Sequence, residues 1–236
     1  MTNPSRAPST RTTVRTRPER GVYDFRIIEA ILDEGLICHV GFVADGQPFA
    51  IPTIYARRGR KVVIHGAVGS RMLRAARSGA PLCITVTLPD GLVLARSAFH
   101  HSVNYRSVVI LGTASEVRNR AQKLAALKAL VEHVMPGRWR EIRQPSEGEL
   151  KATTVLAVPI SEASAKMRFG PPVDRADDYR RKVWAGEIPL RLATSTPKAD
   201  PKLLPGIALP NHVKAYIRAR SEPDSATSRV DDPARQ

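Results

Sequence analysis

The sequence predicts a mainly β protein, a small closed antiparallel barrel of six to seven strands with flanking helices. Apolar runs are separated by tight turns at Asp45-Gly46, Arg58-Gly59 and Pro89-Asp90-Gly91, a pattern typical of antiparallel hairpins. Helical patterns do not alternate with the strands, which disfavours a doubly wound parallel sheet. The chain has 236 residues, 42% of them hydrophobic, which suffices for one domain with a core.

Seven strands are expected between and around these turns. Each is an apolar run of suitable length, and most are bounded by Gly, Pro or Asp. They cover residues 36–43, 47–58, 61–67, 82–88, 91–98, 105–117 and 153–160.

Four helices are expected. The first covers 23–34, where apolar residues recur on one face and Gly35 is placed to end it. A short helix covers 71–78, a third follows the N-cap residue Asn119 and stops at 135–137, and a fourth lies near 208–219.

The two ends of the chain differ in composition from its middle. Residues 1–20 hold five Arg and three Pro with little to bury, so we expect a disordered basic arm. The domain itself is assigned to 21–190, and 191–220 is expected to be an arm whose short helix packs on the barrel or on a partner subunit. Residues 221–236 resemble the first arm, and we expect a disordered tail.

The net charge of +15 favours anionic partners such as nucleotide cofactors, or reflects an Arg-rich composition alone. Nucleic acid is disfavoured because aromatic residues make up only 5% of the chain and no recognised motif is present. No Walker A or GxGxxG motif occurs, and no apolar run approaches ~18 residues, so no membrane span is expected. Cys38 and Cys83 both lie in apolar runs, which suits a reducing cytoplasm.

Three polar segments can carry chemistry. In HGAVGSRMLRAARSG (65–79), Ser70 and Arg71 at a helix N-terminus make a phosphate cradle or an ordinary capped helix. The segment 97–112 contains His100 and His101, but no carboxylate or cysteine lies at metal-ligand spacing, so no metal site is predicted. The segment 161–190 includes Trp184, which either packs on the arm or covers a flat ligand.

Taken in order, several segments make the chain resemble the pyridoxamine 5′-phosphate oxidase-like, FMN-binding split-barrel family, and within it the group related to nitroimidazole reductases. The segments are AILDEGLICHVGFV, GQPFAIPTIYAR, VVIHGAVGSRMLR, LCITVTLPDGLVLARSAFHHSVNYRSVVILG, EHVMPGRW, SAKMRFGPP and VWAGEIPL. The resemblance spans roughly 19–217 and implies a split barrel and a homodimer with flavin at the subunit interface.

The resemblance also implies a set of flavin contacts. The phosphate and ribityl side is assigned to the 65–71 segment, the ring edge to 52–54, and the rest of the pocket to later strands and the arm. His65 is in addition the candidate for reduction chemistry. The implied cofactor-binding residues are Pro52, Thr53, Ile54, His65, Gly66, Ser70, Arg71, Thr85, Tyr105, Ser107, Lys166, Arg168 and Trp184.

The activity that follows is FMN-dependent oxidation and reduction of a small molecule, with a reduced nicotinamide as one possible electron donor. Arg71 or Arg106 would stabilise anionic reduced flavin if its side chain points toward the ring. FAD or a deazaflavin on the same barrel is an alternative, as is a non-catalytic flavin or haem protein in which His65, His100 or His101 binds the iron. The basic C-terminal signature of vitamin B6 oxidation is not evident.

Overall fold

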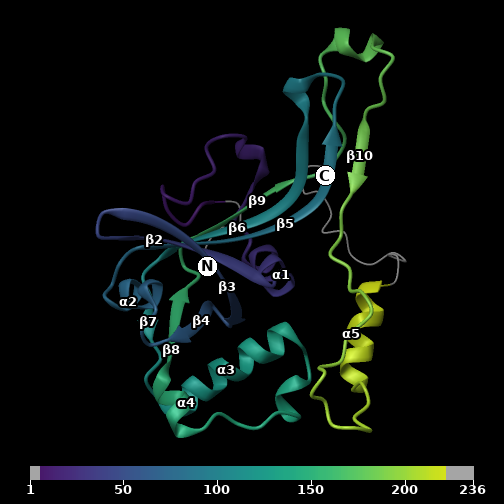
Figure 1. The fold of residues 1–236 in the computed structure, drawn as a ribbon. Coiled ribbons are helices and arrows are strands. Elements are labelled where there is room, and N and C mark those ends of the chain that lie inside the picture. Colours follow the sequence, from purple (N-terminus) through teal and green to yellow (C-terminus); the bar gives the residue numbers. More distant parts are fainter. Residues whose placement is uncertain (1–5, 222–236) are drawn as a thin grey trace.

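The structure, a computed structural model, describes residues 6–221. Its framework is one antiparallel sheet whose strands are hydrogen-bonded in the order β1-β9-β6-β5-β2-β3-β4-β8-β7, with β10 paired to β5 (Figure 1). The strands are β1 (Gly21–Val22), β2 (Ile37–Ala44), β3 (Gln47–Arg58), β4 (Lys61–Ala67), β5 (Leu82–Leu94), β6 (Ser102–Gly112), β7 (Ser115–Glu116), β8 (Thr153–Pro159), β9 (Ala163–Arg168) and β10 (Gly186–Pro189).

The strand order has two free ends, so the sheet is open. The expected split barrel of antiparallel strands with peripheral helices is confirmed, whereas full closure of the barrel is wrong. Seven strands have six or more residues, and β1, β7 and β10 add two to four residues each. The sequence analysis misses β9, because its run ASAKMR is short and contains no β-branched or aromatic residue, and its pairing with β6 is long-range.

The helices are α1 (Phe25–Glu34), α2 (Arg71–Arg77), α3 (Arg120–Val134), α4 (Glu147–Ala152) and α5 (Asn211–Ser221). Two expected starts are confirmed by side-chain caps, because Asn119 accepts from the Gln122 amide at 3.1 Å and Ser70 caps α2. The first helix begins two residues later than expected, after Asp24, which accepts from the Arg26 amide at 2.8 Å. The short 3-10 helices are η1 (Pro18–Arg20), η2 (Ala98–His100), η3 (Arg138–Arg140) and η4 (Ala176–Arg180). None of the helices described over 6–221 has the length and apolar character needed to cross a membrane.

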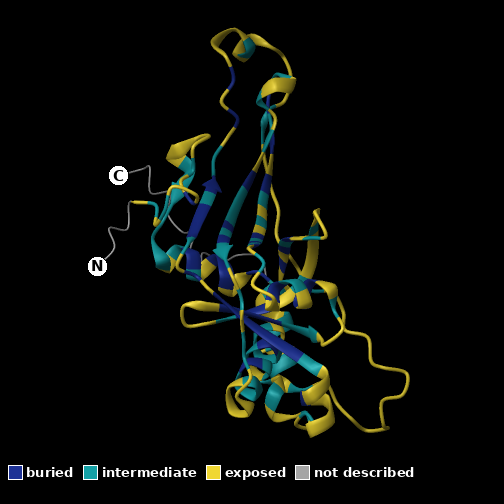
Figure 2. Ribbon diagram, turned by 90° about the vertical axis from the view of Figure 1, so that its left-hand side faces the viewer, coloured by how far each residue is buried: buried dark blue, intermediate teal, exposed yellow. Residues whose placement is uncertain are grey.

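Two apolar clusters divide the interior. The larger one fills the inner face of the sheet beneath α1 and α2, and it includes Leu32, Tyr55 and Ile84, each 0% exposed. The smaller one lies between α3 and the opposite face of β3, β4 and β8. We call this second face the outer face; burial follows the strands, while loops and the C-terminal arm are exposed (Figure 2).

The distal parts of β5 and β6 extend beyond the body of the protein, with β10 along β5 (Figure 1). The expected turn at Pro89-Asp90-Gly91 is wrong, because β5 continues through it to Leu94. A register shift between Pro89 and Gly91 absorbs the extra residue as a β-bulge. The Asp45-Gly46 turn is confirmed, with φ of 51° and 74° at its two residues.

The N-terminal segment 6–20 lies near β1 and β9. Thr12 is buried, the Val14 amide donates to the Tyr23 hydroxyl at 2.9 Å, and Arg11 pairs with Glu162. These contacts give order to part of the arm expected to be disordered. Residues 1–5 and the tail after Ser221 lie outside the described residues.

Candidate functional site

A cavity of about 650 Å³ lies between the outer face of the sheet and the second half of α3; we call it the α3 cavity. The segment 138–149, which follows α3, closes another side of it. Most of its wall is apolar, with side chains from the sheet, the helix and the segment: Ile54, Leu127, Leu130, Val131, Val134 and Ile142. Its size is typical of cofactor pockets.

The cavity exists because α3 buries only part of its apolar side. Ala126 and Leu130 are buried against the outer face. Val134, also expected on the apolar side, is 39% exposed, and with Leu127 and Val131 it lines the cavity. This half of α3 therefore presents apolar surface to an empty volume instead of to the core.

His65 is the imidazole in this wall. It belongs to β4, where alternation places it on the same face as Val63, and it is paired with Val155, another residue of the outer-face cluster. Its Nδ1 is buried without a hydrogen-bond partner. Burial lowers the pKa of His65, so the ring is neutral at physiological pH, the form that can bind a metal.

Two guanidinium groups border the cavity. Arg138 donates to Glu141 at 2.9 Å, and Arg143 donates to Glu149 at 2.5 and 2.7 Å. The ion pair with Arg143 is the main reason why the pKa of Glu149 falls to about 2. One side of a mostly apolar cavity therefore carries two cations, and the Glu149 partner of Arg143 belongs to the same wall.

The Glu132 carboxylate fixes the start of the closing segment. It accepts hydrogen bonds from the Gly137 amide at 2.6 Å and the Trp139 amide at 2.9 Å. These bonds, the Gly137 bond first, lower the pKa of Glu132. The backbone that carries Arg138 and Trp139 into the wall is thus tied to the last turns of α3.

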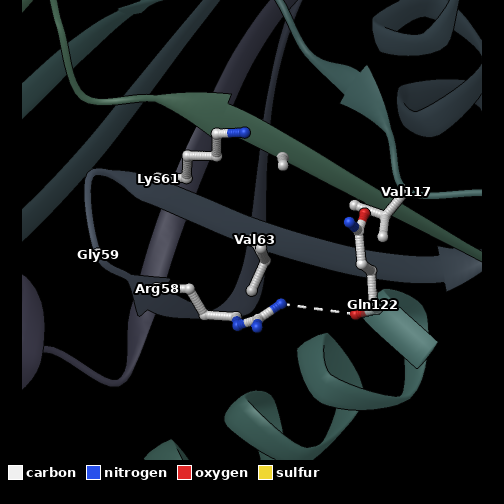
Figure 3. Close-up of a pocket in the computed structure, with 7 residues that line it drawn as sticks. Arg58, Gly59, Lys61, Val63, Val117 and Gln122 are labelled. Atoms are coloured by element: carbon white, nitrogen blue, oxygen red, sulfur yellow. Dashed lines mark hydrogen bonds between the residues drawn. The ribbon is translucent and has the colours of Figure 1, made fainter. Parts of the chain in front are cut away.

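A second cavity, of about 530 Å³, lies on the same face nearer the start of α3. Figure 3 shows Arg58 reaching across it, where its guanidinium donates to the Gln122 carbonyl at 3.5 Å. Lys61 adds a second cation, and Val63 and Val117 supply apolar wall. Its lining residues include no histidine, cysteine or carboxylate, so they offer fewer ligating groups than the α3 cavity.

The outer face gathers several residues implied by the resemblance. Pro52 is opposite His39, which is opposite Thr85; Ser107 is opposite Lys166. Residues opposite one another share a face, as do residues two apart in a strand. The set on this face is Pro52, Ile54, His65, Thr85, Tyr105, Ser107, Lys166 and Arg168.

Thr53 and Gly66 lie on the inner face. Thr53 is opposite the core residue Cys38, and a Cβ on Gly66 would meet Leu73 of α2 at 3.0 Å. On the same side of the sheet, Ser70 accepts from the Leu73 amide at 3.4 Å, and the Arg71 guanidinium lies 4.0 Å from the centre of the Phe49 ring. The structure therefore separates this group from His65 by the thickness of the sheet.

The guanidinium group of Arg106 is already paired with two carboxylates of the chain. It donates to Glu34 at 2.5 and 2.8 Å and to Asp90 at 2.8 and 3.0 Å. It alternates with Val108, whose side chain is buried in the main core, so it does not share the outer face with Ser107. Neither Arg106 nor Arg71 points to the face that carries the other implied contacts.

The C-terminal residues of the implied set have different surroundings. Arg168 donates to Asn104 and to the carbonyls of Gly170 and Pro171, so it fixes the start of the arm. Lys166 is half-buried beside Ser107 on the outer face. Trp184 is 65% exposed and packs against Gly186, where an added Cβ would lie 3.0 Å from the indole ring.

His100 and His101 lie at the far end of β5 and β6. His101 Nδ1 is 2.9 Å from the Ser97 carbonyl, and His100 Nδ1 is 2.8 Å from the Ser97 hydroxyl. Ligand atoms of His100, Asp174 and Asp178 lie within 4.8 Å of one another, a proximity between distant segments that sequence spacing does not reveal. The negative charge of Asp174 is already balanced within the chain, because the amide and the guanidinium of Arg96 donate to its carboxylate at 3.1 Å.

The residues that close the α3 cavity were missed by sequence reasoning. The polar, turn-rich composition of GRWREIRQPSEGEL (137–150) favours a solvated connection, yet Arg138, Trp139 and Ile142 line the cavity. A usable signal was present in Ser146 and Glu149, whose spacing is that of a capping box and predicts α4. No local signal indicates that the segment before α4 folds back over His65.

Comparisons with known proteins agree on one family. The family described as pyridoxamine 5′-phosphate oxidase matches residues 24–167. The flavocytochrome Anf3 from Azotobacter vinelandii is 39% identical, with a TM-score of 0.84 over 89% of this chain and 97% of its own. The FAD and heme binding protein from Mycobacterium smegmatis is 36% identical, with a TM-score of 0.79 over 83% of this chain and 96% of its own.

A more distant structure shares the fold alone. It is described as a candidate 5-nitroimidazole antibiotic resistance protein from Bacteroides thetaiotaomicron, 20% identical, with a TM-score of 0.53 over 62% of this chain and 85% of its own. No curated protein matches the chain.

Proposed function

The chain belongs to the pyridoxamine 5′-phosphate oxidase family, and from that premise we propose that it is a redox protein that binds a flavin and a haem. Two proteins more than a third identical over nearly their whole length are a flavocytochrome and a FAD and heme binding protein. Their likeness supports the two-cofactor function more strongly than a flavin-only one.

The α3 cavity is the observation that carries this proposal. A porphyrin needs apolar walls, its iron needs a neutral imidazole or a comparable ligand, and its propionates need cations. The cavity combines apolar side chains of α3, the half-buried His65 ring and the guanidinium groups of Arg138 and Arg143. An unpartnered buried imidazole nitrogen is otherwise uncommon, and His65 fits the group that the proposal requires.

The flavin is assigned to the outer face beyond β3. Thr85, Ser107 and Tyr105 supply hydroxyl groups there, and Lys166 supplies a cation. Ile54 belongs both to this face and to the wall of the α3 cavity, so the two proposed sites are neighbours. FMN, which the resemblance implies, and FAD share the same ring, and either suits this arrangement.

The protein's own contribution is to bind and shield the two groups. When bound, a flavin exchanges one or two electrons and a haem exchanges one, so together they can couple a two-electron donor to one-electron steps. The apolar side chains of the α3 cavity exclude water, and hydroxyl groups on the outer face orient the ring. A homodimer, a reduced nicotinamide donor, a small-molecule acceptor and a cytoplasmic location complete the proposal.

Expression of the full chain with added riboflavin and haem precursor tests this function. After desalting, we expect both flavin absorbance and a Soret band, each near one cofactor per chain. Chromatography of the released flavin identifies FMN, FAD or a deazaflavin. A colourless protein that retains neither cofactor when both are added back would contradict the proposal.

A further inference from the structure

We infer that His65 is an iron ligand of the haem and that Arg138 and Arg143 receive its propionates. This inference rests on the proposed function, and it assigns the ligand and the orientation of the group within the α3 cavity. The sequence offers three histidines for this role, and their surroundings in the structure distinguish between them.

His65 is the histidine that lines the α3 cavity, and all six histidines of the chain lie within 6–221. Of the other two that the sequence offered, His101 is exposed and hydrogen-bonded to the Ser97 carbonyl. His100 is bound to the Ser97 hydroxyl and lies 3.8 Å from Asp174, beside the Arg96 cation. Neither His100 nor His101 lines either of the two cavities described above.

The remaining histidines are held by other contacts. His133 Nε2 is 2.6 Å from the Gly35 carbonyl, inside the body of the protein. His212 of α5 lies 3.3 Å from Glu141 and packs on Gly137. His39 is exposed on the outer face. His212 Nε2, like His65 Nδ1, is buried without a hydrogen-bond partner, but His212 does not line the α3 cavity. His65 is therefore the histidine that combines an unpartnered buried nitrogen with a place in the wall of this apolar cavity.

The basic side of the cavity sets the orientation. Arg138 and Arg143 belong to the closing segment, across the cavity from the sheet that carries His65. Their carboxylate partners Glu141 and Glu149 are 39% and 47% exposed, and such surface pairs contribute little to stability. Propionates can replace these partners, because Glu141 can turn to water and Glu149 keeps the hydrogen bond that it accepts from the Ser146 amide at 2.7 Å.

The test compares His65→Gly with His101→Gly in the full chain, each expressed with haem precursor and riboflavin. We expect His65→Gly to lose at least about tenfold in haem affinity while flavin absorbance is kept. Added imidazole should restore the Soret band, because it fills the space left by the ring and supplies the missing nitrogen. His101→Gly removes an exposed imidazole and should keep haem content unchanged.

A second variant keeps the test decisive if His65→Gly does not fold. His65→Met retains volume and offers a thioether, so we expect haem to remain with a shifted Soret band. An unchanged spectrum in both His65 variants would overturn the inference and leave the proposed function intact. Loss of flavin together with haem in folded His65 variants would also overturn it, because His65 would then belong to the flavin pocket. Wild-type protein that binds flavin but no haem would instead refute the haem part of the function.

The propionate contacts have their own readout. Arg138→Ala combined with Arg143→Ala should weaken binding of haem by about tenfold, yet leave binding of haem dimethyl ester unchanged, because the ester carries no carboxylates. Arg118→Ala, which removes a cation that is 82% exposed, is the matched control. Equal losses for haem and its ester in the double variant would contradict the assigned orientation.

Discussion

The Tyr55 hydroxyl satisfies a carbonyl at the end of α1. Tyr55 is 0% exposed and donates to the Leu32 carbonyl at 2.6 Å. Leu32 lies in the last turn of the helix, where carbonyl groups have no partner within the helix. The bond therefore ties α1 to β3 and removes a buried unsatisfied acceptor.

Tyr55→Phe should lower the free energy of unfolding by about 1–3 kcal/mol, because the Leu32 carbonyl would stay buried without its donor. Urea denaturation followed by circular dichroism measures the change. Tyr179→Phe makes the same chemical change at a side chain that is 53% exposed and should have little effect. Equal stabilities for the two variants would show that the Leu32 carbonyl finds another donor.

Glu132 predicts a pH dependence. Hydrogen bonds from the Gly137 and Trp139 amides lower the pKa of Glu132 in the folded protein. The ionised carboxylate is therefore more stable in the folded protein than in the unfolded chain. The resulting stabilisation is complete above the ordinary pKa of about 4.5 and is lost as the pH falls through the lower folded value. Glu132→Ala should therefore reduce the melting temperature at neutral pH, with a gap that narrows in acid.

Thermal melts of wild type and Glu132→Ala across this range check that dependence. Glu19→Ala, at an exposed carboxylate of η1, is the control for loss of a negative charge alone. A gap between wild type and Glu132→Ala that does not change with pH would mean that the carboxylate does not act through its charge.

Much of the site at this scale was present in the sequence, but not its geometry. His65, a candidate from the sequence, lines the α3 cavity, and the outer face collects Pro52, Thr85 and Ser107. Strand alternation alone separates His65 from Gly66 and assigns them to opposite faces. The roles of Arg138 and Arg143 were out of reach, because the fold of their segment over β4 is long-range.

Among the helices, α4 depends most visibly on its cap. The Ser146 hydroxyl accepts from the Glu149 amide at 3.2 Å, and the Glu149 carboxylate accepts from the Ser146 amide at 2.7 Å. This capping box begins a helix of six residues that leads directly into β8 and also positions the partner of Arg143. A helix this short depends on its cap, since few backbone bonds form within it.

Ser146→Ala should cost about 1 kcal/mol of unfolding free energy, as loss of an N-cap acceptor does elsewhere. Denaturant titration gives the value. Ser161→Ala, at an exposed serine with no side-chain hydrogen bond among the described contacts, should be neutral. A neutral Ser146→Ala would mean that tertiary packing, not the cap, holds the start of α4.

Strand and helix ends were predictable where one residue fixes the backbone. Ser70 and Asn119 cap their helices as their positions predict, and Asp45-Gly46 turns the chain. Pro89-Asp90-Gly91 has an equally strong turn composition but forms a bulge, because β6 pairs with β5 both before and after it and β10 pairs with β5 from Gly91 onward. Tertiary pairing overrode local preference there, and no short-range pattern reports it.

At the scale of the whole molecule, the distal parts of β5 and β6, together with β10, form an extension of only three strands. Beyond its pairing with β2, β5 is flanked by β6 and β10 alone. Cross-strand pairing places Ile188, Leu92 and Val103 in one row, and they are 43%, 39% and 40% exposed. A contiguous exposed apolar row of this kind is typical of an interaction surface.

We expect this row to contribute to the interface of the homodimer, which the family resemblance implies and which a two-fold arrangement would bury on both copies. Leu92→Lys combined with Val103→Lys should shift the mass measured by light scattering from two chains to one, because the added charges cannot be buried without partners. Val43→Lys introduces the same charge at a side chain that is 56% exposed at the end of β2, and should stay dimeric. If the wild-type protein has the mass of one chain, the homodimer itself is refuted. A dimeric Leu92→Lys, Val103→Lys variant would move the interface away from the β10–β5–β6 extension.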